Sequence, residues 1–207
     1  INNSCQAILR GVLKHWVSQN ALDIDGCGSK LIDQLVEQNL VKSIADLYQL
    51  NLECLSSLER MGDKSARNIL AALEDSKKQP WYKQLYGLGI QHVGESNAKA
   101  LAQAFPAVSE LKYNAENNQH LITKIFGIGD EIAQSLKEWF SNLNNQKLLT
   151  DLNKVGFTLS NKEEEKITDT ELQLNKSLAG QTFVITGTLT SFTRKEAANM
   201  IEKHGGK

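Results

Sequence analysis

A five-residue frame occurs four times in this chain: IDGCG at residues 24–28, LERMG at 58–62, IQHVG at 90–94 and IFGIG at 125–129. Each copy reads apolar, two residues, apolar, glycine. The final glycines are 34, 32 and 35 residues apart, and apolar residues follow each of them at steps of three and four. Because that spacing places one apolar stripe on a helix, the sequence predicts a helix after every glycine.

The stripes occupy corresponding positions in the four repeats. They comprise Ile32, Leu35 and Val36; Ala66, Ile69, Leu70 and Leu73; Ala98, Leu101, Ala102 and Phe105; and Ala133, Leu136 and Phe140. The alanine four residues after three of the glycines would let the helix approach its partner closely. Helices are also expected before the turns, at 7–18, 53–58, 81–88 and 120–125. The repeating unit is therefore helix, tight glycine turn, helix.

Such a unit can bind an anion without lysine. Glycine suits the turn because a side chain would obstruct its backbone angles and the close approach of a ligand. The free N–H groups and the dipole of the following helix then point at the same place, and phosphate is the obvious anion. A glycine that merely caps a helix is the simpler interpretation of one turn, but four identical frames favour a phosphate site.

The four frames are typical of the helix-hairpin-helix family, whose paired motifs bind the sugar-phosphate backbone across the minor groove without reading sequence. The stretches DIDGCGSKLIDQLVE (23–37), LERMGDKSARNILAALEDSKK (58–78) and LGIQHVGESNAKALA (88–102) closely resemble the repeat domain of bacterial NAD-dependent DNA ligases. The resemblance extends over residues 5–157. It implies a C-terminal fragment of an enzyme that seals nicks between a 5′-phosphate and a 3′-hydroxyl in replication and repair.

The expected partner is double-stranded, nicked DNA. The formal net charge of −1 excludes a globally basic binding surface, so contacts must be local. Arg60 and His92 stand where hairpins one and four have glycine, and His92 either contacts phosphate or makes only local hydrogen bonds. The residues predicted to bind DNA are Gly26, Gly28, Lys30, Arg60, Gly62, Lys64, His92, Gly94, Gly127 and Gly129.

No catalytic residue is predicted. The resemblance implies that the parent enzyme uses NAD, Mg and Zn and adenylates a lysine in a Lys-x-Asp-Gly motif. The Asp25-Gly26 pair follows Asp23-Ile24 and belongs to the first hairpin, so the fragment should bind no cofactor and be inactive alone. Cys5 resembles the last ligand of the family's four-cysteine zinc finger. It could hold zinc only with three upstream ligands, and we expect Cys27 and Cys54 to be core residues.

The C-terminal part differs in composition. Residues 161–177 are polar and carry three consecutive glutamates at 163–165, which is typical of a linker. A strand is expected at 183–187 and a helix after a capping box at Thr193 and Glu196. This segment resembles the start of a BRCT domain, in which Thr186 and Gly187 would contribute to a phosphate pocket.

The predicted fold is mainly all-α, with four helix-hairpin-helix repeats, a linker and an incomplete α/β BRCT segment. The expected divisions are 1–22, the end of a zinc-finger region with an entry helix; 23–157, the DNA-binding domain; 158–177, the linker; and 178–207, the BRCT part. Trp16, Trp81 and Trp139 are expected in the core. No stretch favours membrane insertion or secretion, so we expect a cytoplasmic monomer.

Two other functions fit the repeats. The chain could belong to another helix-hairpin-helix repair protein, such as a nuclease subunit. It could also be a protein-interaction scaffold that uses similar helical units without nucleic acid.

Overall fold

The computed structural model describes residues 6–161, 181–184, 197 and 200–201. The chain divides into two units, Ile1–Asn161 and Lys162–Lys207. Within residues 6–161, the chain consists of helices, turns and loops, apart from a single antiparallel bridge between Ala107 and Ser160. The prediction of a mainly all-α fold is therefore confirmed. In the described part of the chain, no helix combines the length and apolar character that crossing a membrane requires.

Eight of the elements form the four hairpins, each made of a first helix, a turn and a second helix. They are α1 (Gln6–Val17) with α2 (Ser29–Glu37), α3 (Leu52–Ser56) with α4 (Asp63–Ser76), α5 (Trp81–Gly87) with α6 (Glu95–Ala104), and α8 (Gln119–Ile122) with α9 (Asp130–Ser141). All eight lie within a few residues of their predicted positions. The structure adds η1 (Ala45–Gln49), α7 (Val108–Asn117) and α10 (Leu143–Lys154), which were not predicted.

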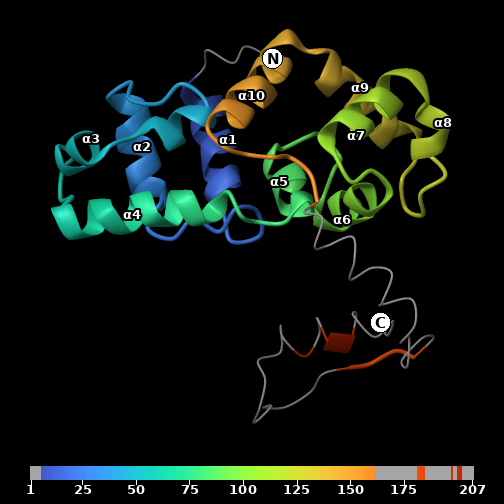
Figure 1. Ribbon diagram of the computed structural model, residues 1–207, viewed down its shortest axis with the longest axis horizontal. Coiled ribbons are helices and arrows are strands. Elements are labelled where there is room, and N and C mark those ends of the chain that lie inside the picture. Colours follow the sequence, from blue (N-terminus) through green and yellow to red (C-terminus); the bar gives the residue numbers. More distant parts are fainter. Residues whose placement is uncertain (1–5, 162–180, 185–196, 198–199, 202–207) are drawn as a thin grey trace. The chain divides into compact units, whose positions relative to one another are not determined.

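The hairpins associate in two pairs. In the first pair, Ile69 of α4 packs against the turn of hairpin one at Gly26, and Gln34 of α2 donates a hydrogen bond to the carbonyl of Glu59 in the turn of hairpin two. In the second pair, α7 packs against α9, and α8 also contacts α9. Figure 1 shows α1 to α4 on one side of the unit and α6 to α9 on the other, with α5 between them.

The second helix of each hairpin presents its stripe to the core, as predicted. The residue four positions after the turn glycine is buried in all four hairpins: Ile32, Ala66, Ala98 and Ala133. Trp16 and Trp81 are completely buried, whereas Trp139 is half-buried and packs edge-on against Phe140. Burial of these large rings supplies much of the apolar stabilisation of a unit built from short helices.

A part-buried chain of hydrogen bonds joins α1, η1 and α4 within the first hairpin pair. The indole Nε1 of Trp16 donates to the hydroxyl of Tyr48 at 2.9 Å, and that hydroxyl lies 3.0 Å from the hydroxyl of Ser76. Ser76 donates its own proton to the carbonyl of Leu73, so Tyr48 must be the donor to Ser76. Burial raises the pKa of Tyr48 well above its ordinary value, which keeps the hydroxyl protonated.

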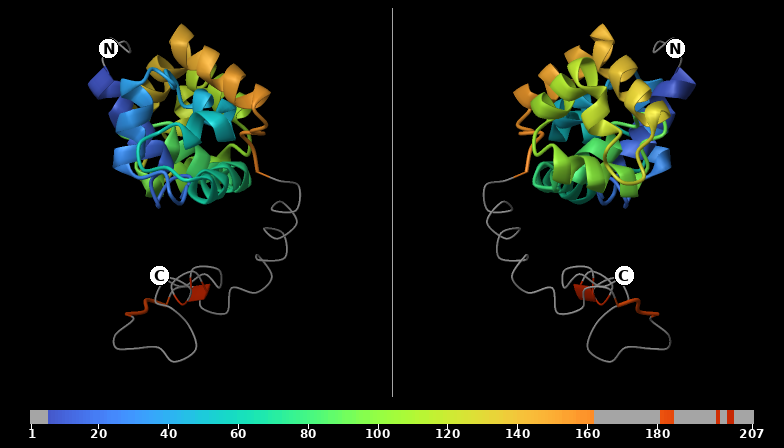
Figure 2. Two further views of the ribbon diagram at one scale, coloured as in Figure 1. Left: turned by 90° about the vertical axis from the view of Figure 1, so that its left-hand side faces the viewer. Right: turned by 90° about the vertical axis from the view of Figure 1, so that its right-hand side faces the viewer.

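Phe157 completes this cluster from the far end of the unit. Its ring packs edge-on against Trp16 and Tyr48. The segment after it pairs with the start of α7, where Val108 donates to the carbonyl of Leu159 and Asn161 donates to that of Pro106. The helix α10 lies along one edge of the unit in every view and carries the chain back to this cluster (Figures 1 and 2). The last residues of the unit therefore fix both hairpin pairs.

The second unit is described at few positions. Ala197, Met200 and Ile201 are helical, as expected for the helix after the predicted capping box. Residues 181–184 have no regular secondary structure, so the predicted strand is absent at 183 and 184. Its remaining positions lie outside the described residues.

Gly87 marks the closest approach of α1 and α5. A Cβ atom at Gly87 would lie 2.8 Å from Leu22 Cδ2 and 2.9 Å from Trp16 Cε3. Trp16 cannot shift without breaking its bond to Tyr48. We predict that Gly87→Ala lowers the free energy of unfolding by about 1–3 kcal/mol through overpacking, as measured by urea denaturation.

Gly11 of α1 provides the matched control, because it is also helical but has nothing within 4 Å of its Cβ position. Gly11→Ala should raise stability by about 0.5–1 kcal/mol through helix propensity alone. Equal effects of the two substitutions would contradict this account of Gly87.

Candidate nucleic-acid interface

Each of the four turns contains the same backbone hydrogen bond. The amide of the fourth residue of each frame donates to the carbonyl of the first, over 3.0–3.2 Å, in a turn of four residues. The bonded pairs are Cys27 and Ile24, Met61 and Leu58, Val93 and Ile90, and Ile128 and Ile125. The apolar first and fourth residues thus face the protein while the two between them are exposed.

The third residue of each frame is left-handed. The φ angles are 79° at Gly26, 62° at Arg60, 64° at His92 and 84° at Gly127. A positive φ at the third position is the requirement of a type II turn, where glycine is the usual residue. Arg60 and His92 therefore adopt the glycine conformation at a cost of about 1–2 kcal/mol each.

The structure corrects the interpretation of the final glycine of each frame, because the turn does not require its backbone angles. Their backbones are extended, with φ between −71° and −100°, which any residue adopts. Nothing lies within 4 Å of an added Cβ at Gly28, Gly62, Gly94 or Gly129, and all four are exposed. The turn angles thus constrain the third residue of the frame and not the last. Open space at the last residue leaves close approach of a ligand as the remaining reason for glycine there.

These glycines also leave the following helices without a side-chain cap. No side-chain hydrogen bond caps α2, α4, α6 or α9. Two other helices of the same unit do have such caps, because Asn51 accepts from the amide of Cys54 and Asn142 accepts from that of Asn144. The second helix of each hairpin therefore presents N-terminal N–H donors that its own N-cap residue does not satisfy.

Cations cluster around the turns of the first pair. Lys30, Lys64 and Arg67 are exposed, and within residues 6–161 none of them has an ion-pair partner. The Arg60 side chain is 86% exposed and pairs only with its neighbour Glu59, at 3.3 Å. An exposed pair of this kind contributes little to stability, so Arg60 can exchange it for another anion.

The turns of the second pair contact each other. Nε2 of His92, in the turn of hairpin three, lies 3.4 Å from a carboxylate oxygen of Glu131 in the first turn of α9. Asn97 of α6 donates to the backbone carbonyl of His92, and its side-chain oxygen lies 4.0 Å from the Cβ position of Gly127. His92 thus makes local contacts, and the turn of hairpin three lies beside the start of α9 in hairpin four.

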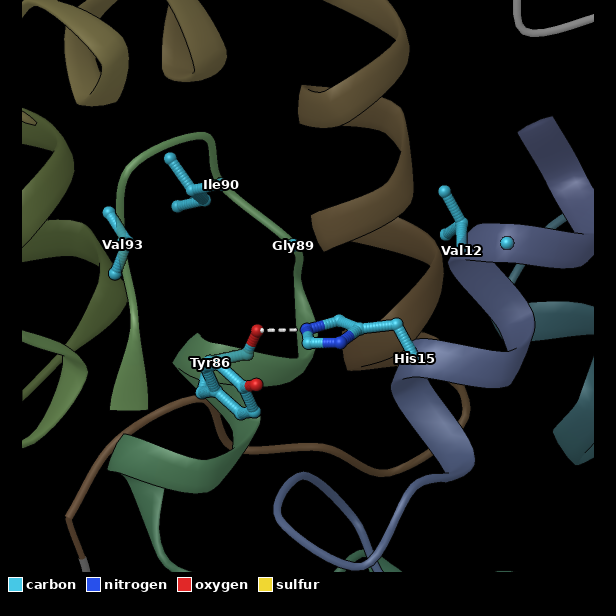
Figure 3. Close-up of a pocket in the computed structure, with 7 residues that line it drawn as sticks. Val12, His15, Tyr86, Gly89, Ile90 and Val93 are labelled. Atoms are coloured by element: carbon cyan, nitrogen blue, oxygen red, sulfur yellow. Dashed lines mark hydrogen bonds between the residues drawn. The ribbon is translucent and has the colours of Figure 1, made fainter. Parts of the chain in front are cut away.

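A hollow of about 340 Å³ lies beside the third turn. Figure 3 shows Val12 and His15 of α1 facing Tyr86, Ile90 and Val93 across it. Nε2 of His15 donates to the carbonyl of Tyr86 at 2.8 Å, and the two rings meet edge-on. His15 thereby joins α1 to the third hairpin.

The described cysteines do not suit a metal centre. Burial, with a smaller effect from Asp25, raises the pKa of the Cys27 thiol to about 12, so it stays protonated. Within the described residues, no three side chains of His, Cys, Asp or Glu converge as metal ligands. Cys5, Thr186 and Gly187 lie outside the described residues.

Phe126, which the sequence analysis passed over, is the second residue of the fourth frame and is completely exposed. The equivalent residues of the other frames are Asp25, Glu59 and Gln91, all polar and exposed. The signal was present in the sequence, since an apolar residue replaces polar ones at an outward-facing position of the repeat.

Family models cover the two hairpin pairs separately. A SAM-like Helix-hairpin-helix tandem matches residues 18–75, and a Helix-hairpin-helix motif matches residues 83–149. A BRCA1 C Terminus (BRCT) domain matches residues 174–207. Both halves of the first unit thus match helix-hairpin-helix models, and a BRCT model matches the chain after them.

Similarity to known proteins covers the whole chain. It is 57% identical over 207 residues to a DNA ligase of Synechococcus sp. (strain CC9311) and 56% identical over 208 residues to one of Prochlorococcus marinus (strain MIT 9303). A DNA ligase of Parasynechococcus marenigrum (strain WH8102) is 54% identical over 209 residues. The chain spans about 30% of the length of each of these relatives. The chain is therefore similar over its whole length to a part of these DNA ligases.

The strained turns yield a stability test. Because Arg60 is left-handed and its side chain is exposed, Arg60→Gly should leave stability unchanged or raise it by up to about 1 kcal/mol, the relief of strain being partly offset by chain entropy. Gly127→Ala should instead lower stability by about 1–2 kcal/mol, although its Cβ would meet no atom closer than the Asn97 side-chain oxygen at 4.0 Å.

Thermal and urea denaturation would measure both effects, with Arg60→Ala as the variant that keeps the strain. A destabilised Arg60→Gly protein would show that the side chain, not the backbone angle, dominates at this turn.

Proposed function

We propose that this chain is the DNA-clamping part of a bacterial NAD-dependent DNA ligase, acting in the cytoplasm as a monomer on nicked double-stranded DNA. The observation that carries the proposal is the fourfold arrangement of an exposed glycine before a helix that lacks a side-chain cap. A single such helix end would be ordinary. Four of them after identical turns form a repeated set of phosphate sites.

Binding would proceed through the backbone. N–H groups at the start of α2, α4, α6 and α9 donate to phosphate oxygens, which the positive ends of the helix dipoles also attract. Because phosphates carry no base information, this binding is independent of DNA sequence. The predicted DNA-binding glycines at 28, 62, 94 and 129 would then act through the absence of a side chain.

Side chains of the first hairpin pair add charge to this contact. Lys30 and Lys64 flank the turn glycines, and Arg60 can turn from Glu59 toward a phosphate. These cations would supply most of the salt-sensitive affinity, since neutral N–H donors release few counterions. In the second pair, His92 would act mainly by holding the two turns together through Glu131.

The parent enzyme would supply the chemistry. It would take AMP from NAD, pass it to the 5′-phosphate of the nick and let the 3′-hydroxyl displace it, with Mg as a further cofactor. This chain would clamp the duplex and transfer no AMP alone. Cys5 would complete a zinc finger only with ligands from the parent, and Thr186 and Gly187 would line a phosphate pocket of the BRCT domain.

The two rival functions receive less support. A nuclease subunit would share the paired hairpins, but the relatives matched over the whole chain carry the name DNA ligase. A protein scaffold would have no need for four uncapped helix ends beside exposed glycines.

Substitution of the final glycines should change the stability of the protein and its affinity for DNA in opposite directions. In Gly94→Ser and Gly129→Ser, the hydroxyl should cap α6 or α9 and raise the free energy of unfolding by a few tenths of a kcal/mol. The same hydroxyl occupies the N–H donors and adds bulk, so affinity for a nicked duplex should fall about tenfold for the double variant, or about 1.4 kcal/mol.

Fluorescence anisotropy with a labelled nicked duplex would measure the affinity, and urea denaturation the stability. Gly11→Ser on α1, away from the turns, is the control. Unchanged DNA affinity in the stabilised double variant would mean that these glycines only begin the helices and do not contact phosphate.

The charges of the first pair allow a separate test. Arg60→Gly combined with Lys64→Ala should lower the slope of log affinity against log salt by roughly 1–2, because each lost phosphate contact removes about 0.9 on B-DNA. Glycine is chosen at position 60 because it removes the charge without the strain of a left-handed alanine.

The measurement is anisotropy across a salt series on two duplexes of unrelated sequence, whose affinities should agree within about tenfold. Lys112→Ala is the control, since that lysine pairs with Glu116 on α7. An unchanged slope in the double variant would refute the assignment of the ionic contact to the first pair.

A further inference from the structure

Phe126 is anomalous for a protein surface. Its side chain is 100% exposed, although a phenylalanine ring gains more from burial than almost any other side chain. No packing role within the unit explains it, since the apolar anchors of this turn are its neighbours Ile125 and Ile128. The other three frames have aspartate, glutamate or glutamine at this position.

The turn fixes the backbone from which the ring projects. Phe126 is held between Ile125 and the left-handed Gly127 by the hydrogen bond from the amide of Ile128 to the carbonyl of Ile125, 3.0 Å long. It precedes Gly129, at the start of α9, by three residues, and so lies at most about 10 Å along the chain from the proposed phosphate site. Exposed Lys124 lies two residues before it and, among the described residues, has no ion-pair partner.

We propose that Phe126 is an apolar wedge that inserts its ring at a base step of the bound duplex when the fourth hairpin docks. This inference rests on the proposed DNA binding and adds a contact to the bases themselves. A ring on a rigid turn, within one turn of a phosphate contact and beside a lysine, can reach past the backbone into a groove. Apolar side chains that enter a groove in this way unstack a base step and bend the duplex.

The wedge would not read sequence, because unstacking involves base faces and not their hydrogen-bonding edges. It would favour steps that are already weakened, where less stacking energy is lost. An interrupted strand provides such a step. The fourth hairpin would therefore prefer a nicked duplex over an intact one, a preference that phosphate contacts alone do not give.

Phe126→Gln tests this, since hairpin three carries glutamine at the equivalent position. The full chain with this substitution should bind a nicked duplex about five- to tenfold more weakly than the wild-type chain, with the salt slope unchanged because no charge is lost. Phe126→Leu should retain most of the affinity, because a wedge needs apolar bulk and not an aromatic face. Leu143→Gln is the matched control, since Leu143 is 79% exposed at the start of α10 and away from the turns.

The second readout is a duplex with 2-aminopurine beside the nick. Its fluorescence should rise on binding of the wild-type and leucine proteins and stay low with the glutamine variant. Circular dichroism should show equal melting for all variants, as expected for an exposed position. Wild-type affinity and fluorescence in Phe126→Gln would overturn the wedge while leaving phosphate clamping intact, and would indicate a protein partner for the ring. Absence of duplex binding by the wild-type chain would overturn both proposals.

Discussion

One backbone hydrogen bond, from the fourth residue of each frame to the first, determines the geometry of the first unit. In all four turns it closes with the third residue left-handed, and two apolar residues then point inward while the glycine after them begins a helix. The same bond recurs at all four hairpins whether the third residue is glycine, as at Gly26 and Gly127, or a residue that must bear the strain, as at Arg60 and His92. The angle is thus kept at these two turns without glycine, at a cost of about 1–2 kcal/mol each.

The turns alone do not determine how the hairpins pack together. Packing also depends on contacts between residues that are far apart in the chain. Trp16, Tyr48 and Phe157 meet in one cluster, and Gly87 allows α5 to approach Trp16. Two short helices joined by a tight turn bury too little surface to be stable alone. The cluster therefore makes one core from units that could not fold separately, and the rigid arrangement of the four turns depends on it.

The sequence was sufficient to predict the features that depend on residues close together in the chain. Periodicity located the second helices, and the frame located the turns, because both depend on residues within five or six positions of one another. The sequence did not predict α7, α10 and η1. These elements cover and connect the hairpins and lie outside the repeated pattern. The bond between His15 and Tyr86, and the need for glycine at position 87, arise only when α1 and α5 meet in space. The need for a special backbone angle in the turn was predicted correctly, but the residue that adopts it is the third of each frame and not the final glycine. Spacing alone cannot separate a residue that needs a positive φ from one that leaves open space for a ligand.

A chain with a net charge of −1 can still attract a polyanion if its positive ends are concentrated. Each helix dipole is equivalent to about half a positive charge at its N-terminus, so four such termini supply roughly two charges without any side chain. Acidic residues in the first turns of α4, α6 and α9 would oppose this attraction, but several are engaged locally. Asp63 accepts from Ser56, Glu95 lies near Lys99, and Glu131 faces His92. Acidic residues in the first turn also favour the helix through its dipole. The first turn of α2 has no acidic residue and carries the exposed Lys30, so nothing in that turn would oppose the attraction of an anion.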